Sequence, residues 1–169
     1  MKQNLEFESH KVSFAENNIA MSFITKLKSA FGNSKSIDKK ATLDTTEAII
    51  QDIEHDPFAI SEENVLYAGL NELGGYYSFQ TVIVGTFKVK TKKGGQLKVT
   101  GKNYNLELNS ESVEFESDPT DIKGRSITKI DFQIEENDAT KITQHQPNQL
   151  VLNCKKQEIV FNTAIAANE

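Results

Sequence analysis

The sequence predicts an α+β protein that is mostly antiparallel β, with two or three short helices ahead of a meander of about eight strands. From residue 76 onward, apolar residues recur at every second position, which is the period of a strand with one buried face. Turn residues interrupt this pattern every eight to twelve residues or so, as in an antiparallel meander. About eight strands are enough to form a barrel or a strongly curved sheet.

The clearest strand pattern lies in residues 76–102. Between residues 79 and 89 the odd positions form an apolar row, which resumes at Leu97 and Val99. A three-residue loop, 93–95, would put both rows on one face by pairing Val89 with Val99 and Thr91 with Leu97. Such a loop needs a left-handed residue at its last position, and Gly95 adopts that conformation without steric cost. We therefore predict a hairpin here.

The N-terminal half carries helical patterns. Residues 1–40 are expected to form an extension with a short amphipathic helix at Met21–Phe31 and a small, charged linker, NSKSIDKK, after it. Residues 41–169 are expected to form one helix-plus-meander domain. A helix is predicted at 42–55, with Asp44 as its cap and Glu47 three residues later. A second is predicted at 61–73, and a strand at 65–70 is the competing interpretation because Gly69 weakens a helix.

The remaining strands follow from the same period of two. One strand is predicted at 104–108, with a turn at Ser110 and Glu111 that pairs Leu108 with Val113 and Leu106 with Phe115. Another is predicted at 130–134, followed by a turn at 135–138 and a weaker strand around residue 142. A turn at 156–157 closes the last hairpin, which sets Cys154 opposite Ile159 and Leu152 opposite Phe161.

Composition restricts the classes of function. The chain of 169 residues has a net charge of -5, which argues against a general nucleic-acid binder. Its single cysteine, Cys154, excludes an internal disulfide framework and favours a cytoplasmic location. No apolar run approaches the roughly 18 residues of a membrane span. Oligomeric state is not indicated by any pattern.

A change of charge within the sheet is the sharpest local feature. The first block is basic and contains no acid, and it consists of Lys88, Lys90, Lys92, Lys93, Lys98 and Lys102. The next is acidic and contains no base, and it consists of Glu107, Glu111, Glu114, Glu116, Asp118 and Asp121. The lysines predict a binding surface for an acidic protein or an anionic ligand. Alternatively, cross-strand pairing with the acidic block explains both blocks structurally.

The amphipathic segment Met21–Phe31 also has two interpretations. Lysines on its polar side suit peripheral contact with an anionic membrane or a partner groove. Helices of this kind more often cover an edge or open end of their own sheet.

Catalytic and cofactor motifs are not evident. His10, His55 and His145 have no metal-ligand spacing with one another or with Cys154, and Cys154 continues the apolar row of its strand. We therefore expect no cofactor and no metal. The first hypothesis is a non-catalytic binding module, and an enzyme is the least favoured of three hypotheses because no motif places a nucleophile, a base and an orienting group together. The alternative is a carrier of a small lipid-like ligand inside the meander. Its inward row is bulky, with Gly85 leaving room: Phe79, Ile83, Phe87, Leu97, Tyr104, Leu106, Phe115 and Phe132.

Overall fold

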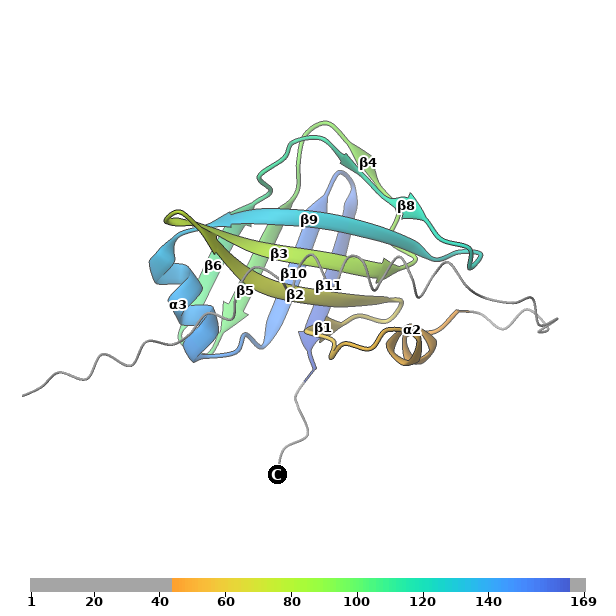
Figure 1. Cartoon of the computed structure of the whole chain (residues 1–169), viewed down its shortest axis with the longest axis horizontal. Helices are drawn as coiled ribbons and strands as arrows, with labels where there is room; N and C mark the ends of the chain where they lie inside the picture. Colours follow the sequence, from red (N-terminus) through yellow and green to blue (C-terminus); the bar gives the residue numbers. More distant parts are fainter. Residues whose placement is uncertain (1–43, 165–169) are drawn as a thin grey trace, which may run out of the picture.

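A computed structural model describes residues 44–164, so the predicted helix at Met21–Phe31 lies outside the described part. The described chain forms a nine-stranded antiparallel sheet that curls into a half-barrel, with the strand order β6-β5-β10-β11-β1-β2-β3-β9-β8 (Figure 1). Its strands are β1 (Ala59–Ile60), β2 (Asn64–Leu73), β3 (Tyr76–Gly85), β5 (Gln96–Gly101), β6 (Tyr104–Asn109), β8 (Asp118–Pro119), β9 (Ser126–Ile134), β10 (Gln149–Cys154) and β11 (Gln157–Thr163). Two more strands, β4 (Lys90–Thr91) and β7 (Phe115–Glu116), form a separate pair. A mostly antiparallel, strongly curved sheet is therefore confirmed.

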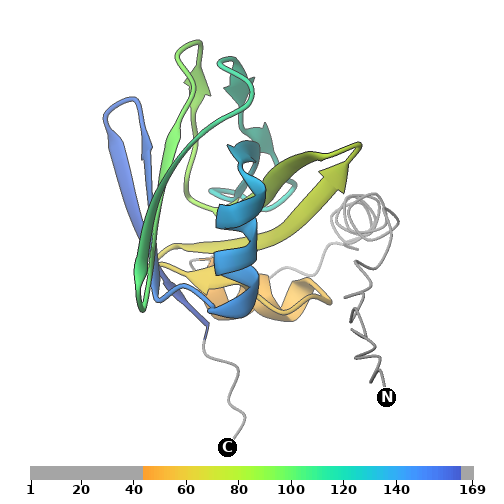
Figure 2. The same cartoon turned by 90° about the vertical axis from the view of Figure 1, so that its left-hand side faces the viewer.

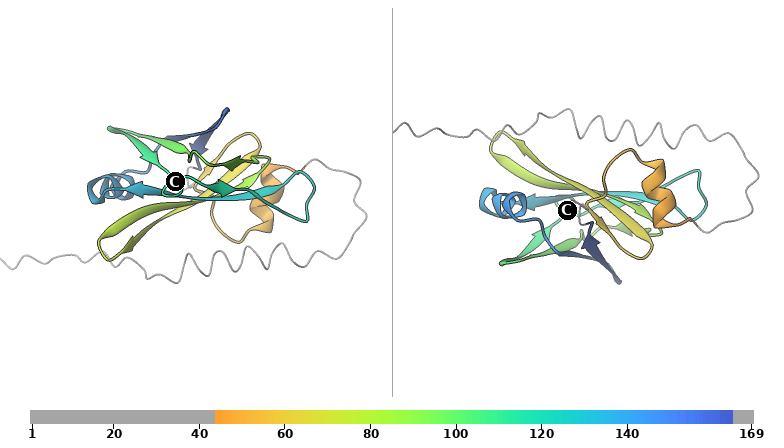
Figure 3. Two further views of the ribbon diagram at one scale, coloured as in Figure 1. Left: turned by 90° about the horizontal axis from the view of Figure 1, so that it is seen from above. Right: turned by 90° about the horizontal axis from the view of Figure 1, so that it is seen from below.

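Two helices occupy opposite ends of the described molecule, α2 (Thr46–Asp52) and α3 (Glu136–Gln144) (Figure 3). Helix α3 lies across the open side of the half-barrel and buries Ala139 and Ile142 in the core (Figure 2). A single β-bridge between Ser110 and Phe132 brings the end of β6 beside β9. The β6 end and the β9 end of the curled sheet thus approach each other at this bridge, and α3 covers the remaining open side. Only α2 precedes the sheet in the described chain, whereas α3 is inserted between β9 and β10.

The inner face of the half-barrel is a packed core. Inward-facing side chains from both halves of the curled sheet belong to one buried cluster, in which Phe79, Phe132 and Phe161 are at most 1% exposed. The alternating burial along β9, β10 and β5 matches the period-2 pattern of the sequence. Because β5, β9 and β10 bury every second residue, the sequence pattern identified most of this core.

A second, smaller cluster lies on the outer face. Helix α2 covers one end of β2 and β3 through Ile49 and Ile53, which pack near Val65, Tyr67 and Val82. The helix starts one residue later than the predicted cap, because Thr45 accepts the hydrogen bond from the backbone N–H of Ala48. The predicted capping role of Asp44 is wrong. Its carboxylate instead binds the guanidinium of Arg125.

The stretch predicted as a helix at 61–73 is β2, so the competing strand interpretation is confirmed and the helix is wrong. All ten residues of β2 pair with β3, from Asn64 opposite Gly85 to Leu73 opposite Tyr76. The turn between them uses Gly74 and Gly75, both with positive φ. Such a two-residue turn matches the twist of a hairpin, which explains why these glycines close two strands rather than end a helix.

The predicted hairpin across residues 79–102 is wrong. Strand β3 ends at Gly85, whose φ is 151°, and the next strand, β4, pairs with β7 instead of β5. Strand β5 pairs with β6 and with β10. The positive φ in the loop belongs to Gly94 and not to Gly95. The apolar row continues past residue 85, but the chain leaves the sheet, so periodicity alone did not reveal the break.

Three further sequence-based predictions differ from the structure. The turn at Ser110 and Glu111 does not fold β6 back on residues 113–115, because β6 pairs with β5 and β7 pairs with β4. The region around Ile142 is the helix α3 and not a strand. The last hairpin is confirmed, but its turn is at Lys155 and Lys156, so Leu152 lies opposite Ile159. This register differs from the prediction by two residues, which leaves the same side chains buried.

Candidate functional site

The lysine-bearing segment 86–93 leaves the sheet immediately after β3. The backbone N–H of Thr86 donates to the carbonyl of Glu63 at 3.3 Å, and that of Phe87 donates to Oδ1 of the buried Asn64 at 2.7 Å. Beyond this anchor, Phe87, Val89 and Thr91 are buried. The lysines at the intervening positions are exposed, since side chains alternate in extended chain: Lys88, Lys90 and Lys92.

One side of this segment is fixed by residues 115–117. Ser117 and Val89 exchange two hydrogen bonds of 2.8 Å, one through the Ser117 hydroxyl and one through its backbone N–H. Lys90 lies opposite Glu116 in the β4–β7 pair, and their charged groups are 2.7 Å apart. The hydrogen bond from the Lys90 ammonium lowers the pKa of Glu116, and the same bond raises the pKa of Lys90. The structural interpretation of the charge blocks therefore applies to this pair.

The other side of the segment lies against the β10–β11 turn. The ammonium of Lys155 donates to the backbone carbonyl of Lys90 at 2.7 Å. The side-chain amide of Gln157 donates to the backbone carbonyl of Lys88 at 3.0 Å. The buried thiol of Cys154 lies 3.5 Å from the carbonyl of Gly94. These contacts bring the β10–β11 turn beside residues 88–93, and the lysines of both segments are exposed. We call the combined group the lysine end: Lys88, Lys90, Lys92, Lys93, Lys155 and Lys156.

Two of the predicted site residues lie elsewhere. Lys98 is on the outer face of β5, opposite Glu107 of β6, and their charged groups are 3.6 Å apart. Lys102 is in the turn between β5 and β6, at the end of β5 remote from Gln96 and the β4 loop. Because the predicted hairpin does not form, Lys98 on β5 does not share a strand pair with Lys88 and Lys90.

Lys155 and Lys156 were not among the predicted site residues, because the pattern of their hairpin does not indicate which other segment its turn lies against. Lys155 has a φ of 56°, which is uncommon outside glycine, asparagine and aspartate. A pair of lysines between two strongly alternating strands was the available signal. Their position beside residues 88–93, however, depends on contacts across more than 60 residues of chain, since Lys155 and Lys90 are 65 positions apart.

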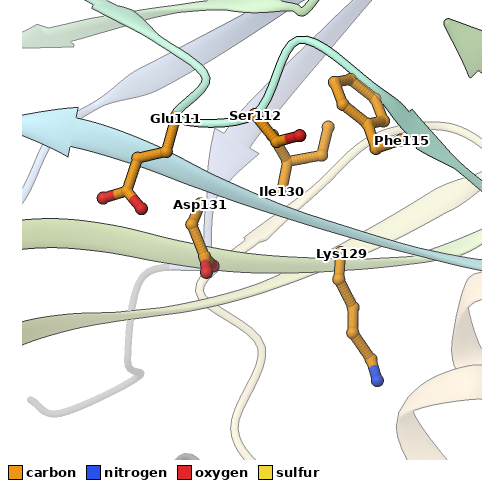
Figure 4. A pocket seen from close by; sticks show the side chains of 6 residues that line it. All are labelled: Glu111, Ser112, Phe115, Lys129, Ile130 and Asp131. Carbon is orange, nitrogen blue, oxygen red and sulfur yellow. The ribbon is translucent and has the colours of Figure 1, made fainter.

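A shallow pocket of about 170 Å³ lies beside β7, between the β6–β7 connection and β9. It is lined by Glu111, Ser112, Phe115, Lys129, Ile130 and Asp131 (Figure 4). Burial raises the pKa of the Asp131 carboxyl, and the charge of Lys129 opposes that shift. The Lys129 side chain extends away from Ser112 and Phe115 in Figure 4. The Ser112 hydroxyl donates to the backbone carbonyl of Glu114 at 2.7 Å rather than to a side-chain base.

The titratable groups considered for catalysis are distributed over the described structure. His55 follows α2, His145 is the C-cap of α3, and Cys154 is 2% exposed in the core. Burial raises the pKa of the Cys154 thiol, whereas a hydrogen bond with Thr91 opposes this shift. His10 lies outside the described residues. Within residues 44–164, no group of three or more histidine, cysteine, aspartate or glutamate side chains is arranged to hold a metal ion.

Helices of the described region are also too short or too polar to cross a membrane. Comparisons of the chain with protein families, with curated proteins and with solved structures found no match.

Proposed function

We propose that the protein is a non-catalytic binding module whose lysine end contacts an acidic segment of a partner protein. The observation that carries this proposal is the convergence of two lysine-bearing segments, 88–93 and 155–156, through the hydrogen bonds of Lys155 and Gln157. Residues that are distant in sequence thereby contribute to one exposed cationic surface. Among the ion pairs of residues 44–164, Lys90 is the member of the lysine end that takes part, and its partner is Glu116.

The charge pattern favours an acidic partner. Clustered ammonium groups repel one another and create a local positive potential, although the whole chain carries a net charge of -5. The aromatic residue of this segment, Phe87, is 3% exposed, so it offers no ring for nucleic-acid bases to stack on. Lysine side chains are flexible point charges, which suits carboxylates at variable positions better than a bidentate site.

The test uses two variants of equal charge and a labelled oligoglutamate peptide as the probe. The first variant removes three charges of the lysine end, as Lys88→Gln, Lys92→Gln and Lys156→Gln. The control removes three exposed lysines elsewhere, as Lys98→Gln, Lys102→Gln and Lys123→Gln. Exposed ion pairs contribute up to about 1 kcal/mol each, so the first variant should bind about tenfold more weakly than the control by fluorescence anisotropy. Equal affinity of the two variants would refute the proposal.

The carrier alternative has less support in the fold. The residues that would line its interior, including Phe79, Leu97 and Phe132, are buried against one another in the main core. Native mass spectrometry of protein purified from its host provides the test. A co-purifying lipid would favour the carrier, and a chain of unchanged mass would count against it.

A further inference from the structure

The outer face of β2 and β3 is covered by described residues only along half of its length. Near Val65, Tyr67 and Val84, helix α2 buries the face. Beyond this region, the outward positions of β2 are Gly69, Asn71 and Leu73, since side chains alternate along a strand. Within the described chain, a Cβ added at Gly69 would meet no heavy atom within 4 Å. This half of the face is therefore open in residues 44–164.

The open half ends in the two most exposed large hydrophobic residues of the described chain. Leu73 is 67% exposed and its cross-strand partner Tyr76 is 83% exposed. The hairpin that carries them extends beyond the rest of the sheet (Figures 1 and 2). These two adjacent side chains offer an apolar contact point for another element of the chain, and aromatic residues are enriched at such contacts.

Gly69 supports the same conclusion independently. Glycine weakens a strand interior because it lacks a packing side chain and has more freedom to lose, and a frequent reason for it is the close approach of another backbone. Gly69 is not among the glycines with positive φ, and no described atom approaches the position of its missing side chain. Turn geometry and crowding within residues 44–164 therefore do not account for it.

The chain itself contains a segment of fitting chemistry that a short linker joins to the described part. The described part begins at Asp44, which binds Arg125 beside α2, the helix that covers the near half. Residues 20–31 precede it and place an apolar row on one helical side: Ala20, Phe23, Ile24, Leu27, Ala30 and Phe31. The intervening residues 32–43 can span about 40 Å when extended, whereas the path from Tyr67 to Leu73 is about 20 Å.

We propose that residues 20–31 dock as an amphipathic helix on the open half of this face, as an intramolecular cover. Its apolar row packs on Leu73 and Tyr76, its backbone passes closest to the sheet at Gly69, and Lys26 and Lys28 face solvent. The short linker keeps the effective concentration of the segment high, so two modest contacts suffice for docking. This inference does not depend on the proposed function of the lysine end.

The experiment uses the full chain with Tyr76→Trp as a reporter, because the sequence contains no tryptophan. In this background, Phe23→Asp with Leu27→Asp disrupts the apolar row of the segment. The matched control, Lys26→Asp with Lys28→Asp, also introduces two acids but on its polar side. Covering an aromatic ring removes most of its surface from water, so acrylamide quenching should be at least about twofold weaker in the control than in the disrupted variant. A synthetic peptide of residues 18–33 should restore protection to the disrupted variant.

Other occupants would be recognised by different results. Equal quenching in the two variants at low protein concentration would overturn the proposal. Protection that appears only as protein concentration rises, together with a dimer in light scattering, would replace the segment with a second copy of the chain. Protection that appears only on addition of anionic lipid vesicles would replace it with a membrane surface.

Discussion

Gly85 is the residue at which the chain leaves the sheet to form the lysine end. A Cβ at this position would lie 2.2 Å from the carbonyl oxygen of Glu63 and 2.6 Å from Oδ1 of Asn64, and its φ of 151° disfavours other residues. We predict that Gly85→Ala lowers the free energy of unfolding by about 2 to 4 kcal/mol, since the backbone of β2 must shift. Urea denaturation measures the loss. The neighbouring Thr86→Ala should cost less than about 1 kcal/mol, and equal costs would contradict this explanation.

Tyr67 is a second residue whose burial has a measurable consequence. It is 3% exposed, and burial raises the pKa of its phenol to about 12, with the charge of Arg125 opposing the shift. An unfolded tyrosine ionises near pH 10, so between about pH 10 and 12 the unfolded chain loses a proton that the folded chain keeps. The contribution of Tyr67 to the free energy of unfolding should therefore be fully present below pH 10. It should be lost as the pH rises through the folded pKa, which lowers the free energy of unfolding by up to about 3 kcal/mol.

Replacing the phenol isolates this contribution from that of other tyrosines. We expect Tyr67→Phe to lose less stability than the wild-type chain between pH 9 and pH 11. Urea denaturation at the two pH values provides the comparison. An identical loss in both proteins would mean that Tyr67 titrates in the folded protein as it does in the unfolded chain.

At the scale of elements, Arg125 attaches α2 to the start of β9. Its side chain is 1% exposed, and it is bound by Asp44 just before the helix and by Asp52 at the helix end, the latter at 2.9 Å. Asp44 is 14% exposed and Asp52 is 49% exposed, so solvent screens the second pair more. Asp44→Asn should cost about 2 to 4 kcal/mol, and Asp52→Asn about 1 kcal/mol or less. Denaturation of both variants tests this order, which equal losses would contradict.

The β10–β11 turn offers a way to separate stability from charge. Lys155 has a φ of 56°, where glycine has no steric penalty, whereas Lys156 has no positive φ. Lys155→Gly should leave the free energy of unfolding unchanged or raise it by about 1 kcal/mol, even though it removes the exposed hydrogen bond to Lys90.

The matched variant, Lys156→Gly, removes the same charge from the same turn. It should lower the free energy of unfolding by about 0.5 to 1 kcal/mol, because glycine adds freedom to the unfolded chain. Both variants should bind the oligoglutamate peptide more weakly than the wild-type chain. A stability loss at Lys155 as large as that at Lys156 would show that its ammonium, rather than its backbone, dominates the turn.

At the scale of the whole molecule, the sequence specified strands and buried faces better than it specified their partners. The alternation along 104–108, 130–134 and 150–161 identified strands that the structure contains, because burial of every second residue is a local property. Pairing is not local. Leu97 of β5 lies opposite Leu152 of β10, which no turn connects to it, so loop length carried no information about that register.

The candidate site was predictable to a similar extent. Lys88, Lys90, Lys92 and Lys93 were visible as a block in the sequence, and the structure keeps them on one exposed segment. Lys98 and Lys102 belonged to the same block but diverge because β5 runs away from the β4 loop toward the β5–β6 turn. Lys155 and Lys156 join this group because β10 pairs with β5, which sets Asn153 opposite Gln96 and so brings the β10–β11 turn beside the residues that precede β5.

The proposed function requires that the two lysine-bearing segments, which the β5–β10 pairing brings together, act as one site for an acidic partner. Chemical-shift mapping by nuclear magnetic resonance, with the wild-type chain titrated with the oligoglutamate peptide, tests it most directly. We expect saturable shifts of the backbone amides of residues 88–93 and 155–156 with one common dissociation constant, and weaker binding as the salt concentration is raised. Shifts of equal size at Lys98 and Lys102, or no saturable shift in either segment, would contradict it.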